Sequence, residues 1–383
     1  MPDKKLKIAQ VITRMDKGGS ADIVRNLICY LQGKHEIKLI YGQTLDPGKK
    51  TKIFFDEFKK NTVLLPVLRR AINPFYDFLA FIMLWHIFKK ERFDIVHCHT
   101  SKAGFLARLA AKAAGLKVTL YMPHGHVFYG YFGSQKTKAI INAEKFAAHF
   151  CEKIITLTNL EKADFIRLNI VSPDKIKVIP PGIDFTELNG IGIRERQETR
   201  RNLAINDNEI AIGLISRLEP VKGVDIFLEA ATLIAKKIPN IKFIICGDGT
   251  LKNKVTQAQS MLGDKLIFLG WREDRLEIMN ALDILVQPSL NEAVGLNIIE
   301  AQALKVAVIA SDVGGIPEII DNNRTGILCK PCAGQVAQAI EKLANDKSLR
   351  NTLAENGWIK TRQEFDFTRM AERIDELYKT VSV

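Results

Sequence analysis

The sequence has little cysteine, and its six cysteines are scattered along 383 residues. One CxxC spacing occurs, from Cys329 to Cys332, but no second ligand pair lies near it and the intervening Lys-Pro is typical of a turn. A zinc ribbon, a redox motif and a disulfide scaffold are therefore disfavoured. We expect free thiols and a cytoplasmic protein.

Long apolar runs are also missing. The most apolar stretch, Phe75 to Phe88, falls short of the roughly 18 residues that a membrane span needs, and it contains Asp77 and His86. The first residues lack the features of a signal peptide. With 25 Gly, 13 Pro and 47% apolar residues, the composition excludes a collagen-like or disordered chain and is ordinary for a globular protein.

Positive charge is concentrated in the first half. Residues 1–180 contain 30 Lys and Arg against 15 Asp and Glu, a net charge of +15, whereas residues 181–383 contain 25 against 28, or −3. A basic half favours an anionic partner: nucleic acid, an anionic membrane surface or a phosphorylated substrate; a solubilising surface is the alternative. Because no RNP, helix-turn-helix or zinc-finger pattern occurs, we expect no nucleic acid.

Strand patterns of about five residues alternate with helical patterns of ten to fifteen, which predicts βαβ units and a parallel sheet. The alternation stops at Pro180-Pro181-Gly182 and restarts near Glu209. We therefore predict an α/β fold of two doubly wound, Rossmann-like domains facing a cleft, 1–180 and 181–363. A C-terminal helix over 364–383 is expected to pack back on the first domain. Ligands of such sheets bind beyond the carboxyl ends of the strands.

Two glycine turns follow predicted strands. Gly18-Gly19 precedes the first helix, where backbone amides can approach an anion; simple turn geometry is the alternative. The full GxGxxG pattern is absent at this turn, which disfavours a nicotinamide enzyme. Gly247-Asp248-Gly249 follows the strand predicted over 241–246 and is suited to contact a nucleotide or to form a turn.

A basic loop, SRLEPVKG over 216–223, lies between a predicted strand and a predicted helix. Its Arg217 can grip a phosphate with two parallel N–H bonds, and its Lys222 adds a point charge. The placement favours a diphosphate site over a solvated surface.

Two glutamates, Glu292 and Glu300, have seven residues between them. We expect Glu292 in the loop after the strand predicted over 282–286, and Glu300 one to two turns inside the next helix. Gly295 and Leu296 come at the start of that helix, where free amides and the helix dipole favour an anion. Carboxylates accept hydrogen bonds from sugar or ribose hydroxyls; a pair of surface glutamates is the alternative.

Two histidines, His124 and His126, flank a glycine after the strand predicted over 117–121. His97 and His99 on the adjacent predicted strand are further candidate metal ligands, but no carboxylate at helical spacing completes a site, and we expect no metal. We interpret His124 as a loop residue that hydrogen-bonds a substrate. A structural loop histidine is the alternative.

Together these motifs resemble glycosyltransferase family 4, retaining enzymes of the GT-B architecture. The second half carries SRLEPVKG, the GDG turn, the E-x7-E pattern and SDVGGIPEII in the family's order. The first half is similar to the branch that works on bacterial cell-surface polysaccharides, through Gly18-Gly19, DIVHCHTSKAG and PHGHVF. The sequence departs from the family's usual Glu-Gly-Phe-Gly-Leu, which reads EAVGL at 292–296.

The resemblance implies roles for these residues. Arg217 and Lys222 would hold the diphosphate of a sugar nucleotide, Glu292 the sugar and Glu300 the ribose, while His124 would lie near the transferred sugar. The implied catalytic residues are His124, Arg217, Lys222 and Glu292. The implied donor-binding residues are Gly18, Gly19, Arg217, Lys222, Gly247, Asp248, Gly249, Glu292, Gly295, Leu296 and Glu300.

We therefore expect a metal-independent, cofactor-free glycosyltransferase that moves a hexose with retention from a UDP- or GDP-linked donor to a cell-surface glycan or lipid-linked diphosphate. No Asp-x-Asp occurs to bind a metal. Two alternatives stay open: a sugar-nucleotide 2-epimerase-like isomerase of the same fold, and a basic nucleic-acid-binding protein. The basic half and the apolar stretch 75–88, followed by Lys89-Lys90, favour peripheral docking on the inner face of the cell membrane; a buried helix is the alternative.

Overall fold

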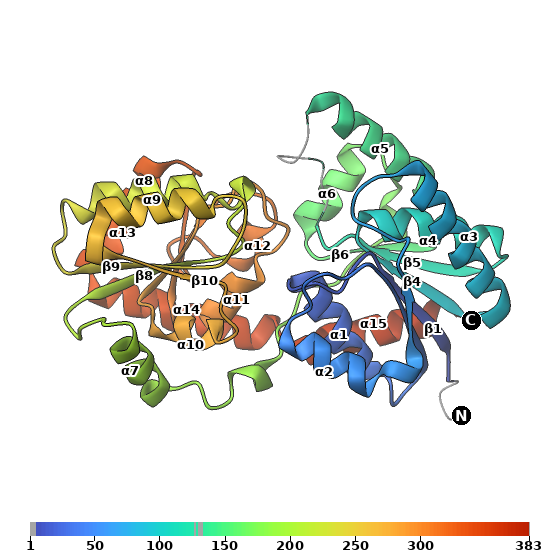
Figure 1. Cartoon of the computed structure of the whole chain (residues 1–383), viewed down its shortest axis with the longest axis horizontal. Helices are drawn as coiled ribbons and strands as arrows, with labels where there is room; N and C mark the ends of the chain where they lie inside the picture. Colours follow the sequence, from blue (N-terminus) through green and yellow to red (C-terminus); the bar gives the residue numbers. More distant parts are fainter. Residues whose placement is uncertain (1–4, 126–127, 129–132, 383) are drawn as a thin grey trace. The chain divides into compact units, whose positions relative to one another are not determined.

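The chain divides into two units, which are described separately (Figure 1). The computed structural model describes residues 5–125, 128 and 133–382. Unit 1 comprises Met1–Pro180 and Thr368–Val383, and unit 2 comprises Pro181–Phe367. The second boundary falls a few residues later than the sequence boundary at 363, because helix α14 runs to Glu364.

Unit 1 is built on a parallel sheet with the strand order β3-β2-β1-β4-β5-β6-β7. Its strands are β1 (Lys7–Ile12), β2 (Glu36–Gly42), β3 (Thr62–Leu65), β4 (Ile95–His99), β5 (Val118–Met122), β6 (Lys153–Thr156) and β7 (Ile176–Val178). Its helices are α1 (Gly19–Leu31), α2 (Lys49–Glu57), α3 (Pro74–Glu91), α4 (Ser101–Ala113), α5 (Ser134–Ala148), α6 (Asn159–Arg167) and α15 (Phe367–Val381), with 3-10 turns at Lys59–Asn61 and Pro173–Lys175.

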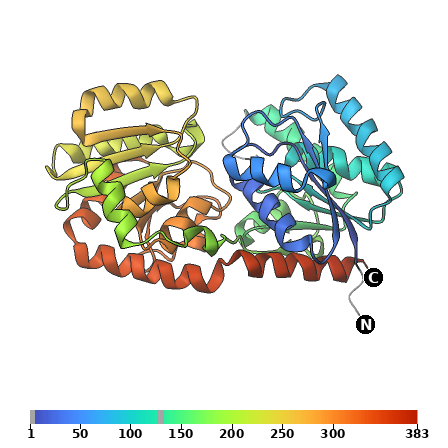
Figure 2. The ribbon, with the colours of Figure 1, turned by 60° about the horizontal axis from the view of Figure 1, so that its bottom comes forward.

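Both faces of the unit 1 sheet are covered. On one face of the sheet, α3 and α4 pack against alternate side chains of β1 and β4. The buried core there contains Val11, Leu84, Phe88 and Leu106. The last helix, α15, also belongs to this unit, as the red helix that ends at the C label in Figure 2 shows. Alternate side chains on β1 and β4 therefore face different layers, as strand geometry requires.

Unit 2 is built on a second parallel sheet with the strand order β10-β9-β8-β11-β12-β13. Its strands are β8 (Ile210–Ile215), β9 (Ile241–Cys246), β10 (Leu266–Gly270), β11 (Ile284–Gln287), β12 (Ala307–Ser311) and β13 (Ile327–Cys329). Its helices are α7 (Ile193–Asn202), α8 (Val224–Ala235), α9 (Lys252–Leu262), α10 (Arg275–Ala281), α11 (Leu296–Ala303), α12 (Ile316–Ile319), α13 (Ala333–Asn345) and α14 (Lys347–Glu364), with 3-10 turns at Phe185–Leu188, Pro220–Lys222 and Gly263–Lys265.

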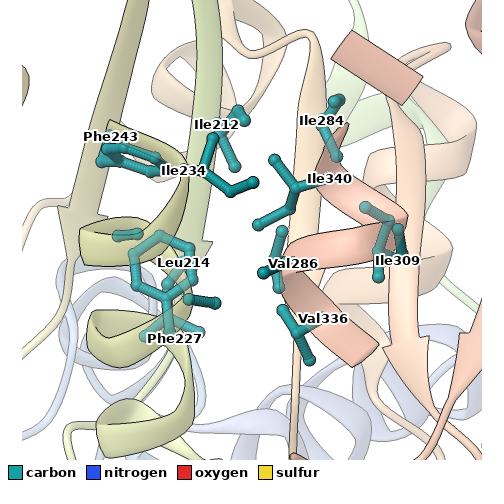
Figure 3. Close-up of a cluster of buried hydrophobic side chains, with 14 of the residues drawn as sticks. Ile212, Leu214, Phe227, Ile234, Phe243, Ile284, Val286, Ile309, Val336 and Ile340 are labelled. Atoms are coloured by element: carbon teal, nitrogen blue, oxygen red, sulfur yellow. The ribbon is translucent and has the colours of Figure 1, made fainter. Parts of the chain in front are cut away.

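The core of unit 2 lies where α8 and α13 pack on the sheet (Figure 3). Helix α8 buries Phe227, Leu228 and Ile234, which recur at helical spacing on one side. These side chains meet Leu214 of β8 and Phe243 of β9, whose ring stands edge-on to that of Phe227 with centroids 6.0 Å apart. The rigid layer holds the carboxyl ends of the strands in place.

The predicted alternation of strands and helices is confirmed, with three helices that the sequence reading did not find: α2, α7 and α12. As expected from the break at Pro180-Pro181-Gly182, strand β7 ends at Val178, because the two prolines lack the N–H groups that would continue it. In the part of the chain that the structure describes, no helix is both long and apolar enough to cross a membrane.

Candidate active site

In both sheets the strand order changes direction beside the unit's first strand. The change falls between β1 and β4 in unit 1 and between β8 and β11 in unit 2. Sheets of this kind bind ligands at that point, beyond the carboxyl ends of the strands. The loops that leave β8, β9, β11 and β12 therefore define the candidate site of unit 2.

The loop after β8 carries both predicted cations. Arg217 is exposed, and its guanidinium has no hydrogen-bond or ion-pair partner in the described part of the chain. The ammonium of Lys222 instead donates to the carboxylate of Glu292 in an ion pair, with the two side chains 15% and 13% exposed. One cation is thus open to solvent, and the other is already held beside a carboxylate.

Glycines let this loop touch its neighbours backbone to backbone. Gly223 has a φ of 69°, and a Cβ on it would lie 1.9 Å from the carbonyl oxygen of Pro288 in the loop after β11. A Cβ on Gly247, in the loop after β9, would lie 1.8 Å from the carbonyl oxygen of Ser216. Both contacts exclude any side chain, and they fix the segment that carries Arg217.

The predicted Gly247-Asp248-Gly249 turn therefore has a packing role. The backbone N–H of Leu218 donates to the carbonyl of Asp248 at 2.9 Å, and a Cβ on Gly249 would lie 2.6 Å from the carbonyl oxygen of Leu218. The Asp248 side chain is exposed and accepts a hydrogen bond from the N–H of Gly249. Its carboxylate is not drawn into the interior.

Glu292 is positioned through its own backbone. Its carbonyl accepts a hydrogen bond from the N–H of Gly315 at 3.0 Å, and a Cβ on Gly314 would lie 1.9 Å from the same oxygen. The SDVGGIPEII motif after β12 thus supports the loop after β11. Gly295, with a φ of 78°, precedes helix α11, which begins at Leu296 as the sequence predicted.

A buried chain of polar side chains leads away from Glu292. Ser289 donates to the Glu292 carboxylate at 3.4 Å, and the Gln287 amide donates to the Ser289 hydroxyl at 2.6 Å. The amide of Asn297 donates to the Gln287 carbonyl oxygen at 2.5 Å. Sequence reasoning missed these three residues, although polar Gln287 and Ser289 directly after an apolar strand were an available signal.

Glu300 lies in the second turn of α11 and is already paired. The guanidinium of Arg275, the first residue of α10, donates to both carboxylate oxygens, with Nη2 to Oε1 at 2.7 Å. A carboxylate has about four acceptor positions, so this bidentate pair leaves room for ribose hydroxyls. The sequence reading missed Arg275, which lies 25 residues before Glu300.

In unit 1, the turn after β1 and the start of α4 show unusual backbone. Gly18 has a φ of 147°, and open space surrounds the position of a Cβ, so the backbone angle alone requires glycine. Gly19 begins α1. Thr100, directly after β4, has a φ of 64°, which is rare for a β-branched residue, and its hydroxyl lies 2.8 Å from that of Thr13. Strained residues of this kind concentrate at functional sites.

His124 lies two residues after the end of β5, at the same edge of the sheet. Its φ is 57°, its Nε2 lies 2.8 Å from Nδ1 of His99, and its buried Nδ1 has no partner among the described residues. Burial lowers the pKa of His124 to about 3, so the ring is neutral at physiological pH. His126 lies outside the described residues.

Each unit offers its own chemistry. In unit 2, the loop after β8 carries an exposed guanidinium and an ammonium, and the ammonium pairs with Glu292, shortly before the N-terminus of α11. These cations and the carboxylate suit a ligand that carries phosphate and hydroxyl groups. Unit 1 has a neutral imidazole at a strained turn, which suits a hydroxyl group.

A family model described as Glycosyltransferase Family 4 matches residues 17–187, and one described as Glycosyl transferases group 1 matches residues 195–358. Over 324 residues the chain is 33% identical to the UDP-Gal:alpha-D-GlcNAc-diphosphoundecaprenol alpha-1,3-galactosyltransferase of Escherichia coli, with 82% of each chain covered. The chain belongs to glycosyltransferase family 4.

This family 4 glycosyltransferase is also similar to proteins at greater distance. It is 26% identical to the capsular polysaccharide biosynthesis glycosyltransferase CapM of Staphylococcus aureus, over 98% of each chain. HepE of Anabaena, solved in complex with UDP-glucose, has a TM-score of 0.82 to it at 22% identity, covering 98% of this chain and 100% of HepE. The GT-B fold predicted from the sequence is confirmed.

Proposed function

We propose that this glycosyltransferase transfers a hexose, with retention, from a UDP- or GDP-linked donor to a lipid-linked diphosphate or cell-surface glycan. The observation that carries the proposal is the Lys222–Glu292 pair at the change of strand order, in the loop that also exposes Arg217. A cation bound to a carboxylate suits the junction between a diphosphate and a sugar. The donor and acceptor in the name of the Escherichia coli relative support this class of donor and acceptor.

The chemistry follows from where charge develops. As the bond between the anomeric carbon and the diphosphate oxygen breaks, negative charge grows on that oxygen. Arg217 and Lys222 stabilise it, so we propose that neither a metal nor another cofactor takes part. The acceptor oxygen bonds to the anomeric carbon on the face that the diphosphate leaves, and the acceptor proton passes to the diphosphate. No protein nucleophile is needed, and Glu292 binds sugar hydroxyls.

Arg217→Ala and Lys222→Ala test this proposal. With UDP- and GDP-hexoses and a lipid-linked diphosphate acceptor, we expect each variant to lose on the order of 100-fold in transfer rate, because a preorganised charge is removed. EDTA should have no effect, and the anomeric coupling constant in the product's NMR spectrum should report retention. Asp225→Asn is the control, since Asp225 of α8 accepts a hydrogen bond from Lys254 of α9 in a solvent-exposed ion pair.

Three results would contradict the proposal. Unchanged turnover in both cation variants would remove the assigned diphosphate site. An inverted product would exclude retention. Epimerisation of the donor without any acceptor would indicate an isomerase.

The outer side of α3 supports a second part of the proposal, a membrane contact. Phe75, Phe78 and Ile82 are 67%, 61% and 38% exposed, and their spacing places them on one side of the helix. The opposite side buries Ala80, Leu84 and Phe88 in the core. Helix α3 is therefore buried on one side only, and an apolar strip on its other side remains exposed.

Positive charge accompanies this strip. Lys89 and Lys90 are exposed in the last turn of α3, and Arg70 is exposed just before the helix. Each Lys or Arg near an anionic lipid surface contributes about 1 kcal/mol of attraction. We propose that α3 docks the enzyme on the cytoplasmic face of the membrane, where a lipid-linked acceptor would be found.

Vesicle sedimentation tests the docking. Phosphatidylglycerol vesicles should pull the protein down at low salt and release it at high salt, because screening weakens exposed charges. The double variant Phe75→Ser and Phe78→Ser should bind less, whereas Met261→Ser, at a residue 73% exposed on α9, should bind like the unaltered protein. Binding that ignores salt, lipid charge and the double variant would exclude α3.

A further inference from the structure

Four buried polar side chains of unit 1 and the half-buried His124 form one continuous hydrogen-bonded chain. Gln10 on β1 and His97 and His99 on β4 are fully buried, and Tyr378 on α15 covers them. Register places Gln10 beside His97, so these side chains lie on one side of the sheet. The chain ends at His124, the residue expected to meet the substrate.

Two of its hydrogen bonds meet at Tyr378. The hydroxyl lies 2.8 Å from Nε2 of Gln10 and 2.6 Å from Nδ1 of His97. Because the Gln10 amide nitrogen can only donate, the Tyr378 oxygen accepts there, and its O–H group can donate to Nδ1 of His97.

The carbonyl end of the Gln10 amide determines which atom donates in each of the remaining hydrogen bonds. Its carbonyl oxygen lies 2.7 Å from Nε2 of His99 and can only accept, so that nitrogen carries a proton. A neutral His99 then has a bare Nδ1, which accepts from Nε2 of His124 at 2.8 Å. His124 is thereby left with a lone pair on Nδ1, an atom that is buried and has no partner among the described residues.

All three rings are neutral, as this pattern requires. Burial lowers the pKa of His97 to about 3 and moves the pKa of His99 well below its ordinary value. The neighbouring histidine rings lower both further. Burial raises the pKa of Tyr378 as well, so its hydroxyl keeps the proton that the chain uses.

We propose that Gln10 and Tyr378 are positioning residues that hold His124 in its Nε2–H tautomer, so that its free Nδ1 accepts a hydrogen bond from a substrate hydroxyl. The lone pair on Nδ1 repels the oxygens of a phosphate. His124 therefore binds a hydroxyl group of the sugar or of the acceptor alcohol. The orientation of the Gln10 amide sets the direction of these hydrogen bonds. A flip of the amide would exchange donor and acceptor in each bond from Gln10 to His124. This inference rests on the proposed function for the identity of the hydroxyl, whereas the tautomer is a property of the free protein.

Nitrogen NMR of protein labelled with 15N-histidine measures the tautomer without substrate. We expect His124 to be entirely Nε2–H in the unaltered protein, and a mixture with the Nδ1–H form in Gln10→Leu and Tyr378→Phe. Asp375→Asn is the matched control, because Asp375 holds the same helix through His35 at 2.6 Å but lies outside the chain of bonds.

The kinetic consequence is measured in parallel. The two variants should lose about ten-fold in kcat/KM, the size of one hydrogen bond, whereas Asp375→Asn should stay within about two-fold. An Nδ1–H His124 in the unaltered protein, or folded variants with an unchanged tautomer, would overturn the inference. If the tautomers shift as expected but no sugar transfer is found with any donor, the failure lies with the proposed function instead.

Discussion

At the scale of residues, Glu292 is held through both its backbone and its side chain. Its backbone carbonyl is fixed by Gly315, and its side chain bonds to both Lys222 and Ser289. The close approach of Gly314 leaves no space for the loop to relax. Lys222 therefore has a partner before any ligand arrives, and a diphosphate must compete for its charge.

Glu292→Gln removes that competitor. We expect the dissociation constant of the tighter of UDP and GDP to fall by about three- to ten-fold, because a Lys–carboxylate pair of this exposure is worth about 1 kcal/mol. Sugar transfer should fall at the same time, since a sugar contact is lost. Calorimetric titration measures the affinity, and Glu219→Gln, at a residue bonded to Thr250, serves as the control. Unchanged or weaker nucleotide binding would contradict the competition.

How much of the site could be predicted depended on spacing along the chain. Lys222 and Glu292 lie in glycine-containing loops that follow strands, where local patterns indicate a site. Arg275, Gln10 and Tyr378 carry no such signal, because their partners are distant in sequence; Gln10 and Tyr378 are 368 residues apart. Contacts of this kind appear only when the fold brings the elements together.

At the scale of elements, α5 is tied to α4 by a buried ion pair. The guanidinium of Arg108 is fully buried, donates to the carbonyl of Gly104 at 2.8 Å and pairs with Glu144 at 2.7 Å. It also lies over the ring of Tyr121 on β5, 4.0 Å from its centre. The pair joins the two helices on either side of the segment that carries His124.

Glu144→Gln would leave the Arg108 charge buried without its counter-charge. We expect unit 1 to lose about 3–5 kcal/mol of stability, as is usual when one partner of a buried pair is removed. Calorimetry should show the unfolding transition of unit 1 at a lower temperature and the unfolding transition of unit 2 unchanged. Asp225→Asn, which breaks the exposed pair with Lys254, should cost under about 1 kcal/mol. Equal losses of stability in the two variants would show that the buried pair contributes no more than the exposed pair.

Helix α7, one of the helices that the sequence did not reveal, has a physical reason for leaving no signal. Helix α7 reads IRERQETRRN and has no apolar stripe of helical period. Its Arg196 and Arg200 instead pair with Asp283 and donate to backbone carbonyls. Amphipathic helices such as α8 could be predicted because burial leaves a periodic signal, whereas a helix attached by arginines leaves none.

At the scale of the whole molecule, the two units differ in their response to pH. All seven histidines lie within residues 1–180, and none lies in unit 2. The buried rings of His97 and His99 are neutral in the folded protein and take up protons when it unfolds. We therefore expect acid to destabilise the first unit before the second.

Between pH 7 and pH 5, unit 1 should lose stability selectively. His97 has a folded pKa of about 3, below its ordinary value of about 6.5, so its contribution is complete above pH 6.5 and is lost as the pH falls towards 3. The slope is about 1.4 kcal/mol per pH unit for each such histidine. Hydrogen exchange, corrected for intrinsic rates, should show falling protection in unit 1 only, with a smaller slope in His97→Gln. Parallel loss in both units would refute this.

The return of α15 to unit 1 also has a consequence for biosynthesis. Residues 368–383, which complete the first lobe, are translated after the entire second lobe. At roughly 5–20 residues per second, residues 1–180 wait ~10–40 s on the ribosome for the helix that shields Gln10 and its neighbouring imidazoles. The lobe made first is thus the lobe finished last, and during that interval a nascent chain exposes a half-covered sheet that chaperones can recognise.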